Sequence, residues 1–231
     1  MTDWLSPSEI EAVLLSLKVA FWATILSLPF GIGVGFVLAR FEFPGKQVLN
    51  GLVHLPLILP PVVTGFILLK LFGTQGPIGG VLKDLGIVIA CSWTGAALAA
   101  AIMAFPLMVR AIRLSFEAVD RRLEDTARSL GASPWAVFAM ISLPLALPGV
   151  VTGSILAFAK AIGEFGATIT FVSNIPGETR TLPSAVYSFM QVPGGEESAY
   201  RLVVLAIVIS MAALLLSEWL AKRVKIVVEG R

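Results

Sequence analysis

The chain has 231 residues, of which 57% are hydrophobic and 14% are charged, and its mean hydropathy is +0.90. In soluble domains about a quarter of all residues are charged, so this composition excludes a water-soluble domain and indicates an integral membrane protein. The length suits one membrane domain and leaves no room for a nucleotide-binding domain beside it. A net charge of +2 is too small to indicate binding to nucleic acid.

Two features of the chain exclude further classes. Cys91 is the single cysteine, so an internal disulfide and a Cys-rich metal site are ruled out. Residues 1–11 are acidic rather than basic, and the apolar stretch that follows is too long for a signal-peptide core. We therefore expect no cleavable signal peptide.

Five apolar stretches are long enough to cross a bilayer, which takes about 20 residues for a core about 30 Å thick. They cover residues 12–39, 49–72, 87–109, 144–162 and 202–221. The expected fold is an all-α integral membrane protein, a polytopic bundle of about five transmembrane helices. Residues 1–231 are expected to form a single transmembrane domain.

The positions of Lys and Arg predict the orientation, because cytoplasmic loops are enriched in both. The loops after the first and third spans and the C-terminal tail carry most of them: Arg40, Lys46, Arg110, Arg113, Arg121, Arg122, Arg128, Lys222, Arg223, Lys225 and Arg231. The loops on the opposite side carry Lys83, Arg180 and Arg201. We therefore expect the N-terminus outside and the C-terminus inside. A sixth crossing within residues 164–192 would break this pattern, so a non-spanning or re-entrant segment is expected there.

Proline and glycine recur inside the predicted spans. The prolines are Pro29, Pro56, Pro60, Pro61, Pro106 and Pro148. Each removes a backbone donor, and such breaks survive in a membrane only against protein or a watery cavity. Gly31 with Gly35 and Gly149 with Gly153 have the four-residue spacing that lets helix backbones approach closely. Ordinary helix packing is the favoured interpretation of the glycines.

The loop at about residues 110–143 is the most informative segment. Apolar residues at helical spacing within 117–130 predict a short amphipathic helix. Gly131 suits the left-handed position after a helix, Ser133 suits an N-cap, and Pro134 suits the first position of a following helix. The loop therefore reads as helix, sharp turn, helix, with the second helix continuing to the membrane at residues 143–144. The pattern alone leaves a plain surface helix as an equal alternative.

The residues Asp125-Thr126-Ala127, then Gly131, then Ile141-Ser142-Leu143-Pro144 resemble the signature loop of ABC-import permeases. That signature reads Glu-Ala-Ala, three residues, Gly, nine residues, Ile, one residue and Leu-Pro. Asp125 and Thr126 depart from it, but Asp keeps the charge and Thr is only slightly larger. The resemblance implies a type I importer permease whose loop docks on an ATPase subunit. It assigns coupling roles to Asp125, Thr126, Ala127, Leu130, Gly131, Ser133, Pro134, Ile141, Leu143 and Pro144.

Further segments are similar to permeases for molybdate and tungstate: 43–46, 55–65, 163–168 and 171–185. Sulfate permeases share the Gly-Glu-aromatic-Gly and Asn-Ile-Pro elements of this region, so sulfate, thiosulfate or tungstate remain alternative substrates to molybdate. The resemblance implies a homodimer in the bacterial cytoplasmic (inner) membrane, with two cytoplasmic ABC ATPase subunits and one external molybdate-binding protein. It implies no cofactor on this chain, with ATP and Mg on the partner ATPase.

A dianion in a low-dielectric path needs cations or hydrogen-bond donors. Lys18, Lys70 and Lys160 map near the outer ends of their helices, where such side chains usually extend to the interface, and His54 is more simply explained by packing. A predicted path or gate combines one carboxylate with weak donors: Glu164, Thr168, Thr170, Ser173, Asn174, Thr181 and Ser184. Because a free carboxylate would repel an anion, we expect Glu164 to pair with Lys160 at i, i+4. The permease is then a low-affinity gate, and an external protein selects the substrate.

Two other classes of protein fit less well. A secondary transporter or channel should have midplane coupling carboxylates and inverted repeats, and neither is evident. A membrane enzyme should have a metal-ligand cluster or a nucleophile beside a base, and His54 is the single histidine. No Gly-rich loop ending in Lys-Ser or Lys-Thr occurs, so ATP hydrolysis is expected on a partner.

Overall fold

The computed structural model describes residues 4–229, and the side chains of residues 4–223. All regular elements within residues 4–229 are helices: α1 (Pro7–Arg40), α2 (Lys46–Ile58), α3 (Pro61–Phe72), α4 (Pro77–Asp84), α5 (Trp93–Ala118), α6 (Arg121–Ser129), α7 (Pro134–Val137), the π-helical turn η1 (Phe138–Ser142), α8 (Leu143–Ile162), α9 (Gly166–Val172), α10 (Leu182–Met190) and α11 (Glu196–Glu229). The predicted all-α class is confirmed.

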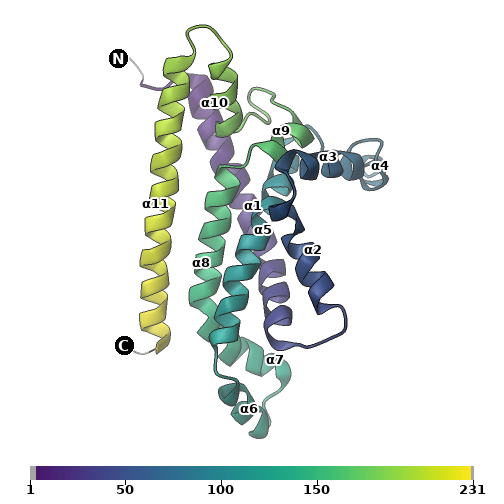
Figure 1. Ribbon diagram of the computed structural model, residues 1–231, viewed down its shortest axis with the longest axis vertical. Coiled ribbons are helices and arrows are strands. Elements are labelled where there is room, and N and C mark those ends of the chain that lie inside the picture. Colours follow the sequence, from purple (N-terminus) through teal and green to yellow (C-terminus); the bar gives the residue numbers. More distant parts are fainter. Residues whose placement is uncertain (1–3, 230–231) are drawn as a thin grey trace.

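Four continuous helical segments in the described part of the chain are long and apolar enough to cross a membrane. They are α1, α5, the run α7–η1–α8, and α11, and a bent pair of helices, α2 and α3, raises the number to five if it forms one span. The start of α1 and the end of α11 lie at opposite ends of the bundle (Figure 1). The predicted number of about five spans is therefore confirmed, and α9 and α10 are too short to add a sixth.

The second predicted span, 49–72, is wrong as a single helix. It divides into α2 and α3, which are bent by 111° at the break. Pro60 and Pro61 cause the break, because Pro61 starts α3 and cannot donate a backbone hydrogen bond back into α2. As a result α3 lies across the bundle rather than along it (Figure 1).

The third predicted span, 87–109, has the wrong limits. Helix α5 begins at Trp93, where the Ser92 side chain caps it by accepting from the Gly95 N–H at 3.4 Å. Gly86 (φ +77°) and Cys91 (φ +57°) adopt left-handed backbone before that point, so residues 87–92 form a connection. Hydropathy alone cannot show whether a short apolar run forms helix or another structure.

Helix α5 is the centre of the bundle, and its neighbours approach it through the predicted glycine pairs. A Cβ on Gly31 would lie 2.7 Å from Met108 Sδ, and one on Gly153 would lie 2.9 Å from the Met108 carbonyl oxygen. Gly35 lies against Ile112 in the same way, and Gly149 against Ser115. The close approach predicted from the four-residue spacing is confirmed, with α1 and α8 both packing on α5.

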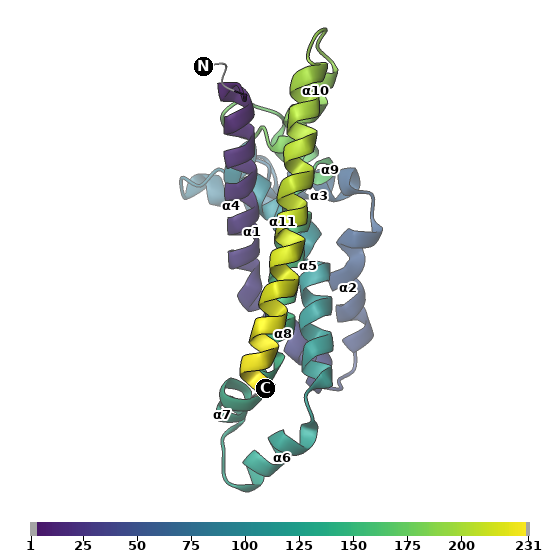
Figure 2. The ribbon, with the colours of Figure 1, turned by 90° about the vertical axis from the view of Figure 1, so that its left-hand side faces the viewer.

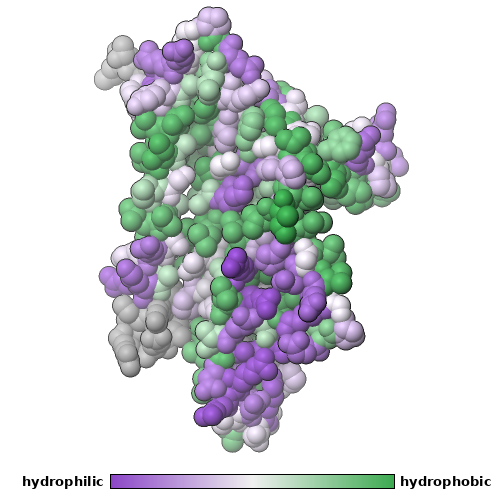
Figure 3. Space-filling model, in the orientation of Figure 1, coloured by the Kyte–Doolittle hydropathy of each residue, from purple (hydrophilic) through white to green (hydrophobic). Residues whose placement is uncertain are grey.

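The surface of the bundle matches a bilayer in its distribution of hydrophobic residues. On the face drawn in Figure 3, hydrophobic residues form a band across the middle, and hydrophilic residues concentrate toward the two ends. Helices α6 and α7 extend beyond one end of the bundle, which is also the end reached by the C-terminus of α11 (Figure 2). Of the basic residues counted above, Arg231 lies outside the described residues, and the side chain of Lys225 is not among those described.

Candidate functional site

The loop between α5 and α8 has the predicted helix–turn–helix form. Helix α6 ends at Ser129, and Gly131 follows in the left-handed conformation at φ +89°. The Ser133 hydroxyl accepts the Ala136 N–H at 3.2 Å, and Pro134 is the first residue of α7. These positions confirm the predicted turn residues, because each satisfies a helix end in the way its residue type allows.

The first helix of the loop is shorter than the predicted 117–130. Residues 117 and 118 belong to α5, and the chain is extended at Val119 and Asp120. The Asp120 carboxylate caps α6 by accepting the Arg122 N–H at 2.9 Å. The periodicity of apolar residues continues across this break, so it cannot reveal where one helix stops and the next starts.

The predicted coupling residues are concentrated on the outward surface of this loop. Those exposed are Asp125, Thr126, Leu130, Gly131, Ser133 and Pro134, while Ala127, Ile141, Leu143 and Pro144 are half-buried. Leu130 is 84% exposed, and two residues not singled out from the sequence, Trp135 (74%) and Met140 (78%), add to the apolar surface. These side chains form an exposed apolar surface at the polar end of the bundle.

One residue of α6 points the other way. Glu124 is buried, with its side chain 4% exposed, and it contacts Arg40 at the end of α1 and Ser142 before α8. Sequence reasoning missed Glu124, because nothing in the spacing of the loop separates a buried carboxylate from an exposed one.

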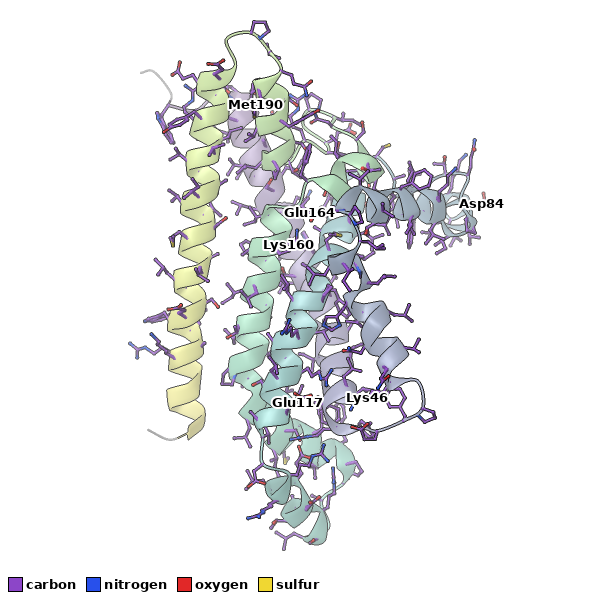
Figure 4. All side chains as sticks on the ribbon, viewed as in Figure 1. Lys46, Asp84, Glu117, Lys160, Glu164 and Met190 are labelled. Carbon is purple, nitrogen blue, oxygen red and sulfur yellow. The ribbon has the colours of Figure 1, made fainter. Side chains whose placement is uncertain are left out.

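The predicted pair of Lys160 and Glu164 is confirmed. Lys160 Nζ lies 2.8 Å from Glu164 Oε2, and the other carboxylate oxygen accepts the Ala167 N–H at 3.1 Å. The Glu164 side chain is 1% exposed and that of Lys160 is 31% exposed. Figure 4 shows both residues at the junction of α8 and α9, close to where α3 crosses. The carboxylate is thus neutralised and does not face an anion path as a free charge.

The other predicted path residues differ in how far they are buried. Thr168, Thr181 and Ser184 are buried, Thr170 and Asn174 are half-buried, and Ser173 is exposed. Thr181 and Ser184 hydroxyls lie 3.3 Å apart, and the Asn174 side-chain amide donates to Ser188 at 2.6 Å. The Ser16 hydroxyl accepts the Leu182 N–H at 2.6 Å, which fastens this segment to α1. Most of these polar groups therefore bind other parts of the same chain.

The remaining basic groups of the spans have neighbours that account for them. Lys18 Nζ lies 3.8 Å from the centroid of the Trp93 ring, and Lys70 Nζ lies 5.5 Å from that of Phe66. His54 Nδ1 lies 2.8 Å from the Asn50 carbonyl oxygen, consistent with the expected packing role. Outside the spans, a hydrogen bond from Lys46 lowers the pKa of the exposed Glu42 carboxyl.

A helix bundle of four to five spans, with a short helix–turn–helix beyond one end, is the architecture of the membrane subunit of a multi-subunit importer. The chain matches the family of binding-protein-dependent transport system inner membrane components over residues 29–226, and it belongs to that family. It is therefore a multi-pass protein of the inner membrane. Within the family it belongs with the molybdenum transport permeases: it is 59% identical to the molybdenum transport system permease protein ModB of Escherichia coli (strain K12), over 94% of this chain and 96% of that one.

More distant proteins resemble the chain as well. A probable sulfate transport system permease protein of Nephroselmis olivacea is 34% identical, over 93% of this chain and 75% of its own length. Among solved structures, the MetNI methionine ABC transporter in an inward-facing conformation matches with a TM-score of 0.75 at 15% identity, over 97% of this chain and 99% of that one. At that identity the match demonstrates the fold alone.

Proposed function

We propose that this chain is the permease subunit of an ATP-driven importer that moves molybdate across the cytoplasmic membrane. The observation that carries the proposal is the loop α6–α7, an ordered bracket with an exposed apolar surface joined directly to the spanning helices. A channel or secondary transporter has no need of such a surface. A partner bound to this loop on one side of the membrane could transmit a conformational change to the spanning helices.

The partners follow from the same loop. The chain would pair with a second copy, because about five crossings with one broken span suit half of a pore. A dimer of ABC ATPases would bind the α6–α7 surface, with ATP and Mg held on those subunits and no cofactor on this chain. Since Lys and Arg concentrate at the α6 end, that end would be cytoplasmic and the N-terminus external.

Molybdate is the preferred substrate, and the degree of similarity supports it. The chain is 59% identical to a molybdenum permease and 34% identical to a probable sulfate permease. Sulfate and thiosulfate are the competing substrates, because they are also small tetrahedral dianions. Tungstate is a third, since the similar segments are shared with tungstate permeases.

The permease itself would hold molybdate weakly, with selection made by an external binding protein. Two observations support this: Glu164 pairs with Lys160, and most hydroxyls of residues 164–184 form hydrogen bonds within the chain. Isothermal titration of the purified permease with molybdate should therefore give no binding in the micromolar range or tighter. Micromolar binding in the absence of the external protein would refute the low-affinity gate.

The test of the proposed function is uptake of radiolabelled molybdate by cells that lack only this chain. Restoring the chain should restore uptake, and unlabelled tungstate should block it while excess sulfate barely competes. A Leu130→Asp variant, which places a charge on the exposed loop surface, should reach the membrane but restore no uptake. Equal competition by sulfate, or no return of molybdate uptake, would reassign the substrate, with sulfate and thiosulfate tested next.

A further inference from the structure

The face of α6 that points toward the bundle carries one buried side chain, Glu124. Its Oε1 atom accepts from Arg40 Nε at 3.0 Å and lies 2.8 Å from Arg40 Nη2. The same oxygen accepts from the Ser142 hydroxyl at 2.8 Å. Three elements, α1, α6 and the π-helical turn η1 that leads into α8, therefore meet at one carboxylate.

Arg40 extends this cluster to a fourth element. It is the last residue of α1, and its Nη2 atom also donates to the Val119 carbonyl oxygen at 3.0 Å, just after α5 ends. The Arg40 and Glu124 side chains are 7% and 4% exposed. Arg121 adds a weaker contact, from Nη2 to the Ala39 carbonyl oxygen at 3.4 Å. A cation at this position is also favoured by the negative end of the α1 dipole.

The rest of α6 is poorly attached to the bundle. Leu123 of α6 is 50% exposed and Leu130, directly after α6, is 84% exposed, so neither leucine holds the helix against the bundle. Besides the long Arg121 contact, its other connections are covalent: the extended chain at Val119–Asp120 and the turn at 130–133. The Arg40–Glu124 pair, in contrast, is a buried, charge-assisted contact.

We propose that Glu124 is the positioning residue through which movement of α6 reaches α1 and α8. The inference rests on the proposed function, in which an ATPase subunit moves α6. When α6 shifts, the carboxylate must carry Arg40 and Ser142 with it or lose bonds that no water can replace in a buried site. The cluster thus turns a push on one short helix into joint displacement of two spanning helices.

The test uses the whole complex in lipid vesicles: this permease, its ATPase and its external binding protein. Glu124→Gln keeps the side-chain shape and an acceptor for Ser142, but removes the charge opposite Arg40. The expected result is an assembled complex with unchanged basal ATP hydrolysis. Two quantities should each fall at least about fivefold: the stimulation of hydrolysis by molybdate-loaded binding protein, and the amount of molybdate moved per ATP hydrolysed. A purely structural role would lower the yield of complex but leave both quantities unchanged.

Glu42→Gln is the matched control, because Glu42 is an exposed carboxylate two residues after Arg40 that pairs with Lys46 at 2.6 Å. It should behave as the wild type. Arg40→Gln should resemble Glu124→Gln, and the double variant should be no worse than either single one, because the two residues act as one pair. Wild-type stimulation and stoichiometry in Glu124→Gln would overturn the inference, and so would additive losses in the double variant.

If the Glu124→Gln complex does not assemble, the Ser142→Ala variant tests the inference instead, because it deletes one hydroxyl and leaves the ion pair in place. Reduced stimulation in an assembled Ser142→Ala complex supports the inference, and wild-type stimulation overturns it. Failure of the proposed function looks different, since the wild-type complex itself would then show no stimulation by loaded binding protein and no molybdate uptake.

Discussion

At the scale of single residues, the charges of the bundle are placed in pairs. Glu9 is fully buried and lies 3.0 Å from Arg201 Nη2, which joins α1 to α11. Glu124 joins the other end of α1 to α6 through Arg40, and Glu164 pairs with Lys160. A buried carboxylate without its partner is costly, so the Glu9 and Glu124 pairs each make the positions of two helices interdependent.

Glu164→Gln should lower stability and uptake without changing the substrate preference. It leaves the Lys160 ammonium without its partner while an amide oxygen can still accept the Ala167 N–H. Breaking a fully buried pair costs about 3–5 kcal/mol, and because Lys160 is 31% exposed we expect about 1–3 kcal/mol. The Tm of the purified permease measures the loss, and competition between molybdate and sulfate measures the preference.

The double variant Lys160→Met with Glu164→Gln is the control, since it leaves no lone charge and should recover much of the Tm. A change in the molybdate-to-sulfate ratio in Glu164→Gln would contradict this role and place the carboxylate in selection instead.

At the scale of the elements, glycine sets the distance between α5 and its neighbours. Gly31 and Gly35 on α1, and Gly149 and Gly153 on α8, all lie against α5, where a Cβ would overlap its atoms. Gly33, in the middle of the same run on α1, has no neighbour within 4 Å. Adding a side chain should therefore have opposite effects on stability at Gly33 and at the glycines that face α5.

Gly153→Ala should destabilise the bundle and Gly33→Ala should stabilise it. The added methyl at 153 meets the Met108 carbonyl at 2.9 Å, so the helices must separate, at about 1–3 kcal/mol. At 33 the methyl meets open space and helix propensity rises by up to about 1 kcal/mol. Thermal unfolding of the two purified variants in one detergent gives the comparison. Equal shifts of Tm in the same direction would show that packing on α5 is not tight.

The exposed surface of the loop gives a second prediction at this scale. Leu130→Ser should reduce co-purification of the ATPase subunit without changing the Tm of the permease, because an 84% exposed leucine adds little to the fold and, on the proposed function, contacts the ATPase. Val48→Ser is the control: Val48 is 65% exposed near the same end of the bundle, but lies outside the loop. Loss of the ATPase in both variants would mean that the binding surface is not confined to the loop.

At the scale of the whole molecule, an apolar band lies between two polar ends on the face drawn in Figure 3. The α6–α7 loop lies at one end, and the N-terminal end of α1 with the 190–195 turn lies at the other (Figure 1). Of the described side chains, most Lys and Arg of the connecting loops belong to the α6 end. The orientation that follows from this asymmetry is open to a direct test, because the chain contains one cysteine.

Cys91 is exposed just before α5 begins, near the end of the bundle opposite α6. A membrane-impermeant maleimide should therefore label it in right-side-out vesicles and not in inverted ones. Arg122→Cys in a Cys91→Ser background should show the reverse, since Arg122 is exposed on α6. Labelling of Cys91 in inverted vesicles would mean that the chain is inserted the other way round.

The sequence by itself determined the class of fold, the approximate number of spans, the turn at Gly131–Pro134, the glycine contacts and the Lys160–Glu164 pair. Hydropathy and spacing carry this information because each feature depends on residues close together along one helix or turn. Only the tertiary structure decided the 111° bend at Pro60–Pro61, the start of α5 at Trp93 and the Arg40–Glu124–Ser142 cluster. These features depend on contacts between helices, such as the one between Glu124 and Arg40, which are 84 residues apart. The local pattern of apolar residues carries no information about such contacts.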